Sequence, residues 1–464
     1  MNRKKMLFVD RTPHPAGNHE RQTNRALAPF ASVNFLALIF LVLTAGASQS
    51  AAAASLCVNP SGTSGCYSTI GAAVAAASST AIDTIKVWPG RYPEDVIIGK
   101  SVSLVGMDAR DTIIDATNLS NGIYVDGADN PGLNHVVISG FTVRNAMFEG
   151  ILVTSASFVT IWANRVAHND RSLDPAALIC PGLPSFERGE GTAGLADCGE
   201  GIHFSGVHHS TITNNIVEFN AGGILLSDEM GATHENLITG NVTRNNPFAS
   251  GITLASFPPA SGADVPVGIS RNTIARNQSV HNGYRNPGAG IGLISASGEF
   301  VPPYPFGGTV SNNSLMDNEL RDNGAPGILL HSFGPGDNLS DNLIVGNRIS
   351  GNGADAADAA VPGPTGISIF GVSSISGANI SQNEIRDEKT AVAINTNALV
   401  QAHLNNFFCD AAVIDNLTSG MVDATENWWA SRDFDDPSGA VQGSGVLVKP
   451  ALHKPFDLLE DDYR

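Results

Sequence analysis

The sequence predicts an all-β solenoid, in which short strands stack coil upon coil around a continuous apolar interior. Two recurring patterns predict it. One is Asn-x-apolar-x-x-Asn, and the other is a glycine-led strand, Gly-Ile-x-apolar, which follows some residues later. Repeats of roughly 20–50 residues are typical of solenoids, because each unit buries its apolar face only against its neighbours.

The two patterns cover most of the chain. The asparagine pattern begins at Asn164, Asn215, Asn241, Asn277, Asn318 and Asn347. Its third position is polar at Thr243 and Ser279. Degenerate copies lie at Gly140 (GFTVRN) and at Asn383 (NEIRDE), which lacks the second asparagine. The glycine-led strands begin at Gly150, Gly201, Gly223, Gly251, Gly290, Gly327 and Gly366.

Each repeat contains short runs that alternate apolar and polar residues, as in Ser210–Asn214, Asn215–Val217 and Gly223–Leu226. Alternation over three or four residues indicates strands, and Asn and Gly indicate turns. We therefore expect three strands in each coil of a β-helix. Asparagine suits the corner because it tolerates left-handed backbone and its amide can bond the next coil, roughly 4.8 Å away. Glycine begins the next turn without a Cβ penalty. An asparagine-rich disordered segment is disfavoured because Ile, Leu and Val recur in register.

Residues 1–54 are predicted to be a secretory signal. Six basic residues between Arg3 and Arg25 precede an apolar run, Phe35–Leu43, and small residues follow to Ala54. A positive segment, a short apolar core and a small-residue exit are typical of such signals. An uncleaved membrane anchor is the alternative, although nine strongly apolar residues are few for a span of ~20.

The remaining elements follow in order. Residues 55–95 are expected to form an N-terminal cap and the strand leading into the coils, with one helix over Thr69–Ala77 laid on the open end of the solenoid. Coils are expected over residues 96–450. Trp428 and Trp429 would cover the last apolar layer, and a platform for sugar rings is the alternative. Residues 451–464 are predicted to be an acidic tail.

The repeats, the stretch PGRYPEDVII…KSVSLVG (Pro89–Gly106) and VDATENWWA (Val422–Ala430) resemble the pectin-lyase-like superfamily over roughly Val96–Trp429. The resemblance implies a right-handed parallel β-helix of about 10–12 coils with a short N-terminal capping helix. It does not imply one activity, because the superfamily includes polysaccharide lyases, hydrolases, esterases, epimerases and proteins with no known catalysis. The WIDH and RxPxxR motifs of pectate lyases are absent, as are the motifs NTD, GDD and GHG of polygalacturonases and DFIFG and LGRPW of pectin methylesterases.

Net charge limits the classes of partner, and cysteine spacing indicates the redox compartment. The formal net charge is −18 over 464 residues, and removal of residues 1–54 makes it more negative. Such a surface repels nucleic acid and anionic membranes, and it repels polyuronates unless a cation or an arginine patch intervenes. The spacings of Cys57 with Cys66 and of Cys180 with Cys198 suit disulfides in an oxidising compartment, whereas Cys409 is left over.

Candidate site residues come from the outward positions of the glycine-led strands. One row contains Leu152, His203, Leu225, Thr253, Gly292, Leu329 and Ser368, and the other contains Thr154, Ser205, Ser227, Ala255, Ile294, His331 and Phe370. We predict Asp228 or Glu229 as an acid or cation ligand, and His203 or His331 as a base. The alternative is that Asp228 and Glu229 form a solvated turn and both histidines are surface residues. His208, His209 and His234 are expected to be exposed and to lack metal-ligand spacing.

Aromatic residues in the insertions that follow these strands are predicted to bind sugar rings. They are Phe257, Phe300, Tyr304, Phe306 and Phe333, which successive coils would place side by side as one aromatic wall. The sequence thus favours a secreted or cell-surface protein that binds an extracellular polysaccharide, or binds it and acts on it as a lyase, hydrolase or epimerase, with calcium as the candidate cofactor. A non-catalytic extracellular scaffold or surface-interaction protein is the alternative.

Overall fold

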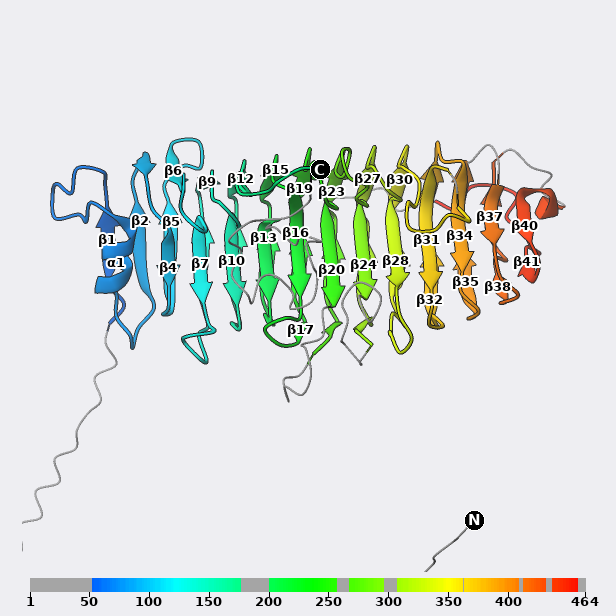
Figure 1. The fold of residues 1–464 in the computed structure, drawn as a ribbon, viewed down its shortest axis with the longest axis horizontal. Coiled ribbons are helices and arrows are strands. Elements are labelled where there is room, and N and C mark those ends of the chain that lie inside the picture. The colour runs from blue at the N-terminus through cyan, green and yellow to red at the C-terminus, as the bar shows by residue number, and fades with distance from the viewer. Residues whose placement is uncertain are drawn as a thin grey trace, which may run out of the picture. The chain divides into compact units, whose positions relative to one another are not determined.

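The computed structural model describes residues 52–176, 200–256, 267–295, 307–361, 363–408, 412–430 and 436–457. Three long parallel sheets run the length of this part of the chain, and successive coils contribute strands to the three sheets in turn. This arrangement is a right-handed parallel β-helix, as predicted, and Figure 1 shows the coils in sequence order from β1 to β41.

We name the sheets A, B, C and D. Sheet A has 14 strands: β1 (Ser55–Val58), β2 (Asp83–Val87), β5 (Val102–Gly106), β8 (Val137–Ser139), β11 (Thr160–Trp162), β14 (Thr211–Thr213), β18 (Leu237–Thr239), β22 (Thr273–Ala275), β26 (Ser314–Met316), β29 (Leu343–Val345), β32 (Ala378–Ser381), β35 (Val400–His403), β38 (Val422–Asp423) and β41 (Val446–Leu447). Sheet B has 12 strands: β3 (Gly90–Tyr92), β6 (Thr112–Asp115), β9 (Thr142–Arg144), β12 (Arg165–Ala167), β15 (Ile216–Glu218), β19 (Val242–Arg244), β23 (Gln278–Val280), β27 (Glu319–Arg321), β30 (Arg348–Ser350), β33 (Glu384–Arg386), β36 (Asn406–Phe408) and β39 (Trp428–Trp429).

Sheet C carries the glycine-led strands. Its 12 strands are β4 (Val96–Ile98), β7 (Ile123–Asp126), β10 (Ile151–Thr154), β13 (Glu200–Ser205), β16 (Gly222–Ser227), β20 (Ile252–Ser256), β24 (Ile291–Ser295), β28 (Ile328–Ser332), β31 (Thr365–Gly371), β34 (Thr390–Asn395), β37 (Ala412–Asn416) and β40 (Val441–Gly443). Sheet D is short and contains β17 (Thr233–His234), β21 (Ile269–Ser270) and β25 (Val310–Ser311). The 12 strands of sheets B and C agree with the predicted number of coils.

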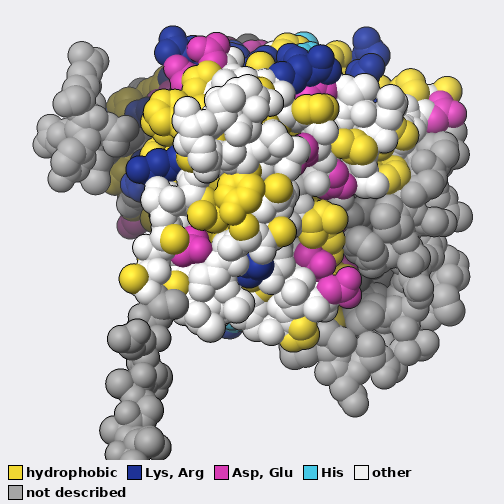
Figure 2. All heavy atoms as spheres, turned by 90° about the vertical axis from the view of Figure 1, so that its left-hand side faces the viewer, with side chains coloured by type: hydrophobic (Ala, Val, Ile, Leu, Met, Phe, Trp, Pro, Cys, Tyr) yellow, Lys and Arg dark blue, Asp and Glu magenta, His cyan; other side chains and the backbone are white. Residues whose placement is uncertain are grey.

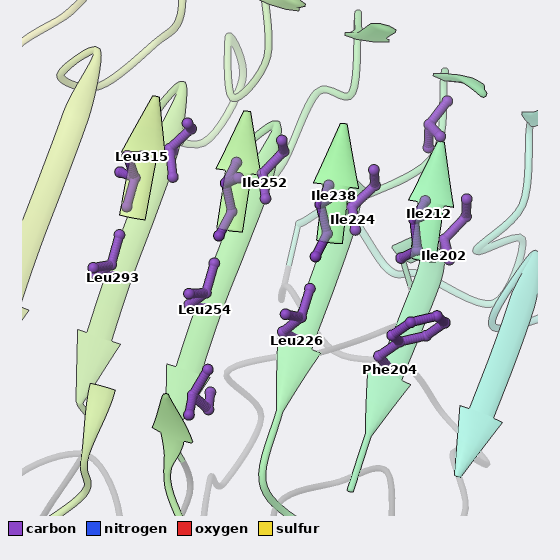
Figure 3. Close-up of a cluster of buried hydrophobic side chains, with 14 of the residues drawn as sticks. Ile202, Phe204, Ile212, Ile224, Leu226, Ile238, Ile252, Leu254, Leu293 and Leu315 are labelled. Carbon is purple, nitrogen blue, oxygen red and sulfur yellow. The ribbon is translucent and has the colours of Figure 1, made fainter. Parts of the chain in front are cut away.

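The interior is a stack of aliphatic side chains in register. Ile202 pairs with Ile224, which pairs with Ile252, and all three are fully buried. Figure 3 shows Phe204, Leu226, Leu254 and Leu293 forming a second row in the same core. Because each apolar layer is covered by the next coil, a long chain is stabilised without a second core.

Asparagine side chains form buried columns at the corners, as the repeat predicts. In the first column each amide donates to the side-chain oxygen of the next asparagine, through Asn164, Asn215, Asn241, Asn277, Asn318, Asn347, Asn383, Asn405 and Asn427. The second column contains Asn169, Asn220, Asn246, Asn282, Asn323 and Asn352. A third, shorter column contains Asn236, Asn272, Asn313 and Asn342.

Part of the sequence-based reason for asparagine is wrong. The column asparagines do not have left-handed backbone; the residue before each one does, as at Ala163 (φ 55°), Asn214 (φ 54°) and Arg276 (φ 54°). Asparagine is therefore selected by its amide alone. The degenerate copy GFTVRN is also misplaced by one residue. The position equivalent to the column asparagines is Phe141, whose backbone N–H donates to Asn164 Oδ1, and not Gly140.

Glycine at the start of the sheet C strands is explained by close packing. A Cβ atom at Gly150 would lie 2.3 Å from Val166 Cγ1, and one at Gly327 would lie 2.4 Å from Ile349 Cγ2. Neither glycine has positive φ. The corner of each coil thus lies directly against the core of the same coil, where only glycine fits.

The N-terminal end is capped by one helix, α1 (Ile70–Ala76). Ile70, Ala73 and Val74 are buried, and the Glu94 carboxylate accepts hydrogen bonds from the backbone N–H groups of Ile70 (2.8 Å) and Gly71 (2.9 Å). A carboxylate at this end of a helix complements its dipole. Figure 2 looks onto this end, where hydrophobic side chains lie in separate groups among polar and charged ones. The coils begin earlier than residue 96, since β1, β2 and β3 already belong to sheets A and B.

The C-terminal end is closed by Trp429, which is fully buried with its ring centroid 5.3 Å from that of Phe407. A structural role for Trp429 is confirmed. The short 3-10 helix η1 (Pro437–Ala440) follows. Within the predicted tail, Phe456 N donates to Asn406 Oδ1 at 2.8 Å, and so the described residues 451–457 are attached to the coils. Among the described residues, no helix could span a membrane.

Several predicted elements lie outside the described residues. They are most of the predicted signal segment (1–51), Cys180, Cys198, Cys409, residues 458–464 and four members of the aromatic wall, Phe257, Phe300, Tyr304 and Phe306. The other disulfide, Cys57–Cys66, is present with an S–S distance of 2.07 Å.

Candidate functional site

The outer face of sheet C holds His203 and His331, as the repeat predicts. Ile202 and Phe204 point into the core, so His203 between them points outward. Outward does not mean exposed, however. His203 and His331 are each 1% exposed, and Leu152 and Leu225 on the same face are buried although they lie outside the core cluster. The alternative that both histidines are surface residues is therefore wrong.

His203 joins three neighbouring coils through a chain of hydrogen bonds. Its Nδ1 lies 2.9 Å from Glu149 Oε1, and its Nε2 lies 2.9 Å from Ser227 Oγ. Ser227 Oγ also lies 2.9 Å from Glu229 Oε2, and its single proton can go to Glu229 or to His203 Nε2 but not to both at once. We call Glu149, His203, Ser227 and Glu229 the His203 cluster. Carboxylate, imidazole and hydroxyl in this order can relay a proton, because the carboxylate fixes the Nδ1–H tautomer and leaves Nε2 facing the hydroxyl.

The two acidic residues predicted together have separate environments. Glu229 belongs to the His203 cluster, with Oε2 3.8 Å from His203 Nε2. Asp228 is fully buried, and its Oδ2 accepts hydrogen bonds from Ser256 Oγ (2.6 Å) and Gly268 N (2.8 Å). The alternative of a solvated Asp228-Glu229 turn is wrong. Asp228 holds the start of the next coil, which is a structural contact.

His331 lies in a second, similar arrangement. Its Nε2 is 2.7 Å from Asp355 Oδ2, which also accepts a hydrogen bond from Ser368 Oγ at 2.7 Å. Burial would raise the pKa of Asp355, but the hydrogen bond and charge of His331 and the hydrogen bond from Ser368 hold that pKa below its usual value. The rings of Phe333 and Phe370 each lie with centroids 5.1 Å from that of His331. Phe333 is thus the one described member of the predicted aromatic wall.

The two histidines are not brought together. β13 and β28 are separated in sheet C by β16, β20 and β24. Four spacings of about 4.8 Å place the histidines roughly 19 Å apart along the stack. They cannot act on the same bond, and any catalytic role belongs to one of them.

A cavity of about 490 Å³ lies over the last strands of the same face. Its polar lining comes from Lys389, Thr390, Asp415, Asn416 and Gln442, and its apolar lining includes Val361 and Leu417. Asp415 pairs in register with Gln442 of β40, so both side chains leave the sheet side by side. Burial, with a contribution from the charge of Asp358, raises the pKa of the Asp415 carboxyl.

Lys389 forms one side of this cavity. The side chain packs beside Gly363, where a Cβ atom would lie 2.4 Å from Lys389 Cδ. The ammonium nitrogen lies beside the same glycine, 3.3 Å from that Cβ position, and Lys389 as a whole is exposed. Sequence reasoning missed this group, because no motif connects Lys389, Asp415 and Gln442 and only strand register assembles them.

One group of side chains in the described part of the chain could hold a metal ion. One donor atom from each of His209, His234 and Glu235 lies within 4.8 Å of the others. The expectation that these histidines lack metal-ligand spacing is wrong. The corner that follows sheet C brings His209 of one coil beside His234 of the next, through the pairing of His208 with His234.

Comparison with known proteins identifies the fold. The family model described as "Right handed beta helix region" matches residues 112–300. No curated protein matches the chain in sequence. The Dettilon tailspike protein is 12% identical and has a TM-score of 0.51; the match covers 79% of this chain and 62% of the tailspike.

Two enzymes are less similar in structure. Alginate lyase from Paenibacillus sp. str. FPU-7 is 11% identical, with a TM-score of 0.42 and coverage of 85% of this chain and 99% of that chain. DFA-IIIase from Arthrobacter chlorophenolicus A6 without its lid, in complex with GF2, is 13% identical and has a TM-score of 0.49. The match covers 83% of this chain and 96% of that enzyme. At these identities the likeness concerns the fold alone.

Proposed function

We propose that this chain, a right-handed parallel β-helix protein of the pectin-lyase-like fold, binds an extracellular polysaccharide on the outer face of sheet C. The observation that carries the proposal is the cavity over β34, β37 and β40. Its volume of about 490 Å³ falls in the range of small-molecule sites and suits one or two sugar units.

The lining of the cavity has the chemistry that a sugar needs. A sugar unit presents hydroxyl groups around its rim and C–H groups on its faces. The carboxylate of Asp415, the amides of Asn416 and Gln442 and the ammonium group of Lys389 provide donors and acceptors, and Val361 and Leu417 provide apolar contacts. Because the chain is strongly acidic, with a net charge of −18, we expect a neutral polysaccharide to bind better than a polyuronate.

The proposed location outside the cell agrees with two features. The Cys57–Cys66 disulfide is stable in oxidising compartments, and the first 54 residues have the pattern of a secretory signal. Appearance of the protein in the culture medium, shortened at the N-terminus, tests this part of the proposal. Retention of the full chain inside the cell would contradict it.

Calorimetric titration with neutral and acidic oligosaccharides tests binding. We expect Asp415→Asn, Gln442→Ala and Lys389→Ala each to weaken binding about tenfold, because each removes a polar contact in a partly desolvated site. Gln401→Ala and Lys86→Ala are matched controls, since both residues are exposed on sheet A. Binding that none of the cavity variants weakens, or no binding of any oligosaccharide, overturns the proposal.

Catalysis on the bound polysaccharide is the second candidate, favoured by the order of Glu149, His203 and Ser227. In this candidate His203 is the base and Glu149 orients it. The test follows unsaturated uronate and reducing ends with and without calcium. Turnover that is lost in His203→Gln but kept in His281→Gln, which changes an exposed histidine, supports it. Absence of turnover overturns catalysis, and absence of both turnover and binding favours the non-catalytic scaffold.

A further inference from the structure

We propose that His209, His234 and Glu235 form a binding site for a divalent transition-metal ion such as Zn²⁺. The site lies at the corner between sheets C and A, apart from the proposed polysaccharide cavity. It does not depend on the proposed function.

The three donor atoms have the spacing that a small four-coordinate ion requires. Glu235 Oε2 lies 2.9 Å from His234 Nδ1 and 3.4 Å from His209 Nδ1. Ligands about 2.1 Å from a tetrahedral centre are roughly 3.4 Å from one another. Imidazole nitrogen and carboxylate oxygen are suitable ligands for Zn²⁺, whereas Mg²⁺ and Ca²⁺ favour sites made of oxygen alone.

His208 adjoins this group without being part of it. His208 Nδ1 lies 3.2 Å from His209 Nδ1, so in the metal-free protein one of these nitrogens must carry a proton and the other must accept it. A metal ion would displace that proton. His208 also stacks on His234, with ring centroids 5.0 Å apart and an interplanar angle of 2°, which fixes the orientation of the His234 ring.

The carboxylate is held in place from its other side. Arg271 Nε lies 3.4 Å from Glu235 Oε1, which leaves Oε2 facing the two histidines. Contacts of this kind orient a ligand and raise the affinity of a metal site. The positive charge of Arg271 opposes metal binding, but it is directed at the oxygen that the ion does not use.

The position of the site indicates its effect. His209 belongs to the coil of β13, whereas His234 lies in β17 of sheet D, in the next coil, and Glu235 follows it directly. An ion bound to all three would link two successive corners on the outside of the stack. Because the ion binds the folded arrangement and not the unfolded chain, it would stabilise these coils.

If the histidine rings only stack on one another and bind no metal ion, the variants should behave differently. Aromatic rings also stack at the equivalent corner of earlier coils, where the rings of His135 and Phe158 have centroids 5.1 Å apart. If stacking were the only role, His135 and His209 would be equivalent. His135 Nδ1 contacts the Asn134 side-chain oxygen and, among the described residues, no carboxylate, so it provides the matched control.

The full chain is treated with chelator, dialysed and titrated with Co²⁺, whose visible absorption reports four-coordinate geometry, and then with Zn²⁺ in competition. We expect one ion per chain and a higher melting temperature with Zn²⁺. His234→Ala and Glu235→Gln should each weaken binding at least about tenfold, whereas His135→Ala should leave it unchanged. Circular dichroism confirms that each variant is folded. The proposal is overturned if the wild type binds the ion only weakly and the His209→Ala/His234→Ala double variant binds it equally. It is also overturned if His135→Ala loses as much affinity for the ion as His234→Ala does.

Discussion

Glu388 Oε1 accepts two hydrogen bonds from Asn352, one from the backbone N–H at 2.9 Å and one from the side-chain amide at 3.0 Å. A carboxyl group thus continues the second asparagine column by one coil. It occupies the position at which the repeat NEIRDE lacks its second asparagine. Among the described residues, Glu388 Oε2 has no hydrogen-bond partner.

This substitution makes stability depend on pH. Burial, with smaller contributions from the charges of Asp387 and Asp322, raises the pKa of Glu388 from 4.5 to about 7. Because the folded protein holds the proton more tightly, the stabilising contribution is complete below pH 4.5 and is lost as the pH rises towards 7. Above that range the buried charge costs on the order of 3 kcal/mol.

We therefore predict that Glu388→Gln stabilises the protein at pH 8 and has little effect near pH 4. Glutamine keeps an oxygen for Asn352 and cannot ionise. Urea unfolding of both proteins across this pH range measures the difference. A difference in stability that stays constant with pH would show that Glu388 does not titrate in the folded state.

Interrupting an asparagine column should strongly lower the free energy of unfolding. Asn277 Oδ1 accepts from the backbone N–H and the side-chain amide of Asn241, both at 3.0 Å, and Asn277 Nδ2 donates to Ile238 O at 2.9 Å. Asn277→Ala leaves buried groups on both neighbours without partners, so we expect a loss of about 3 kcal/mol or more.

Asn286→Ala is the control for this change. The Asn286 side chain makes one partly buried hydrogen bond, to Phe248 O at 3.0 Å, and its loss should cost about 1 kcal/mol. The midpoint of urea unfolding compares the two variants. Equal shifts in the midpoint would mean that the column contributes nothing beyond ordinary side-chain hydrogen bonds.

Sequence predicted the fold because strict spacing leaves few alternatives. Asparagines five residues apart flank six strands of sheet B, from β12 to β30, and a slip of one residue would break two columns at once. The sequence did not reveal that the left-handed residue precedes each asparagine, since residues as different as Ala163 and Arg276 occupy that position. Amide hydrogen bonding can be recognised from residue type, whereas backbone conformation at these corners is imposed by the coil.

The candidate site was predicted only in part. The repeat places His203 and His331 on the outer face of sheet C, but it does not identify their partners. Glu149 lies 54 residues from His203, and Asp355 lies 24 residues from His331. These separations depend on the lengths of insertions and not on the repeat. His209 and His234 were missed for the same reason, because the contact forms between corners of successive coils.

The N-terminal disulfide should act locally. The sequence separation of 9 between Cys57 and Cys66 closes a small loop, for which chain entropy predicts about 2–3 kcal/mol. In a solenoid each coil contacts only its neighbours, so reduction should loosen residues 55–76 and leave the central coils intact. Hydrogen exchange followed by mass spectrometry, with and without dithiothreitol, measures this. Faster exchange throughout sheet C would contradict local action.

The His331–Asp355 pair provides the last prediction. Asp355→Asn leaves a buried histidine without its carboxylate, and we expect a loss of about 3 kcal/mol at pH 7. Ser368→Ala, which removes one hydrogen bond to the same oxygen, should cost about 1 kcal/mol. Because the folded pKa of Asp355 is lowered, its contribution is present above the unfolded value of 3.8 and is lost as the pH falls further towards the folded pKa. The stability difference between wild type and Asp355→Asn should therefore shrink below pH 3.8. Thermal unfolding of the three proteins at pH 7 and at acid pH measures both effects, and a difference that persists undiminished in acid would exclude the ionised Asp355 carboxylate as its source.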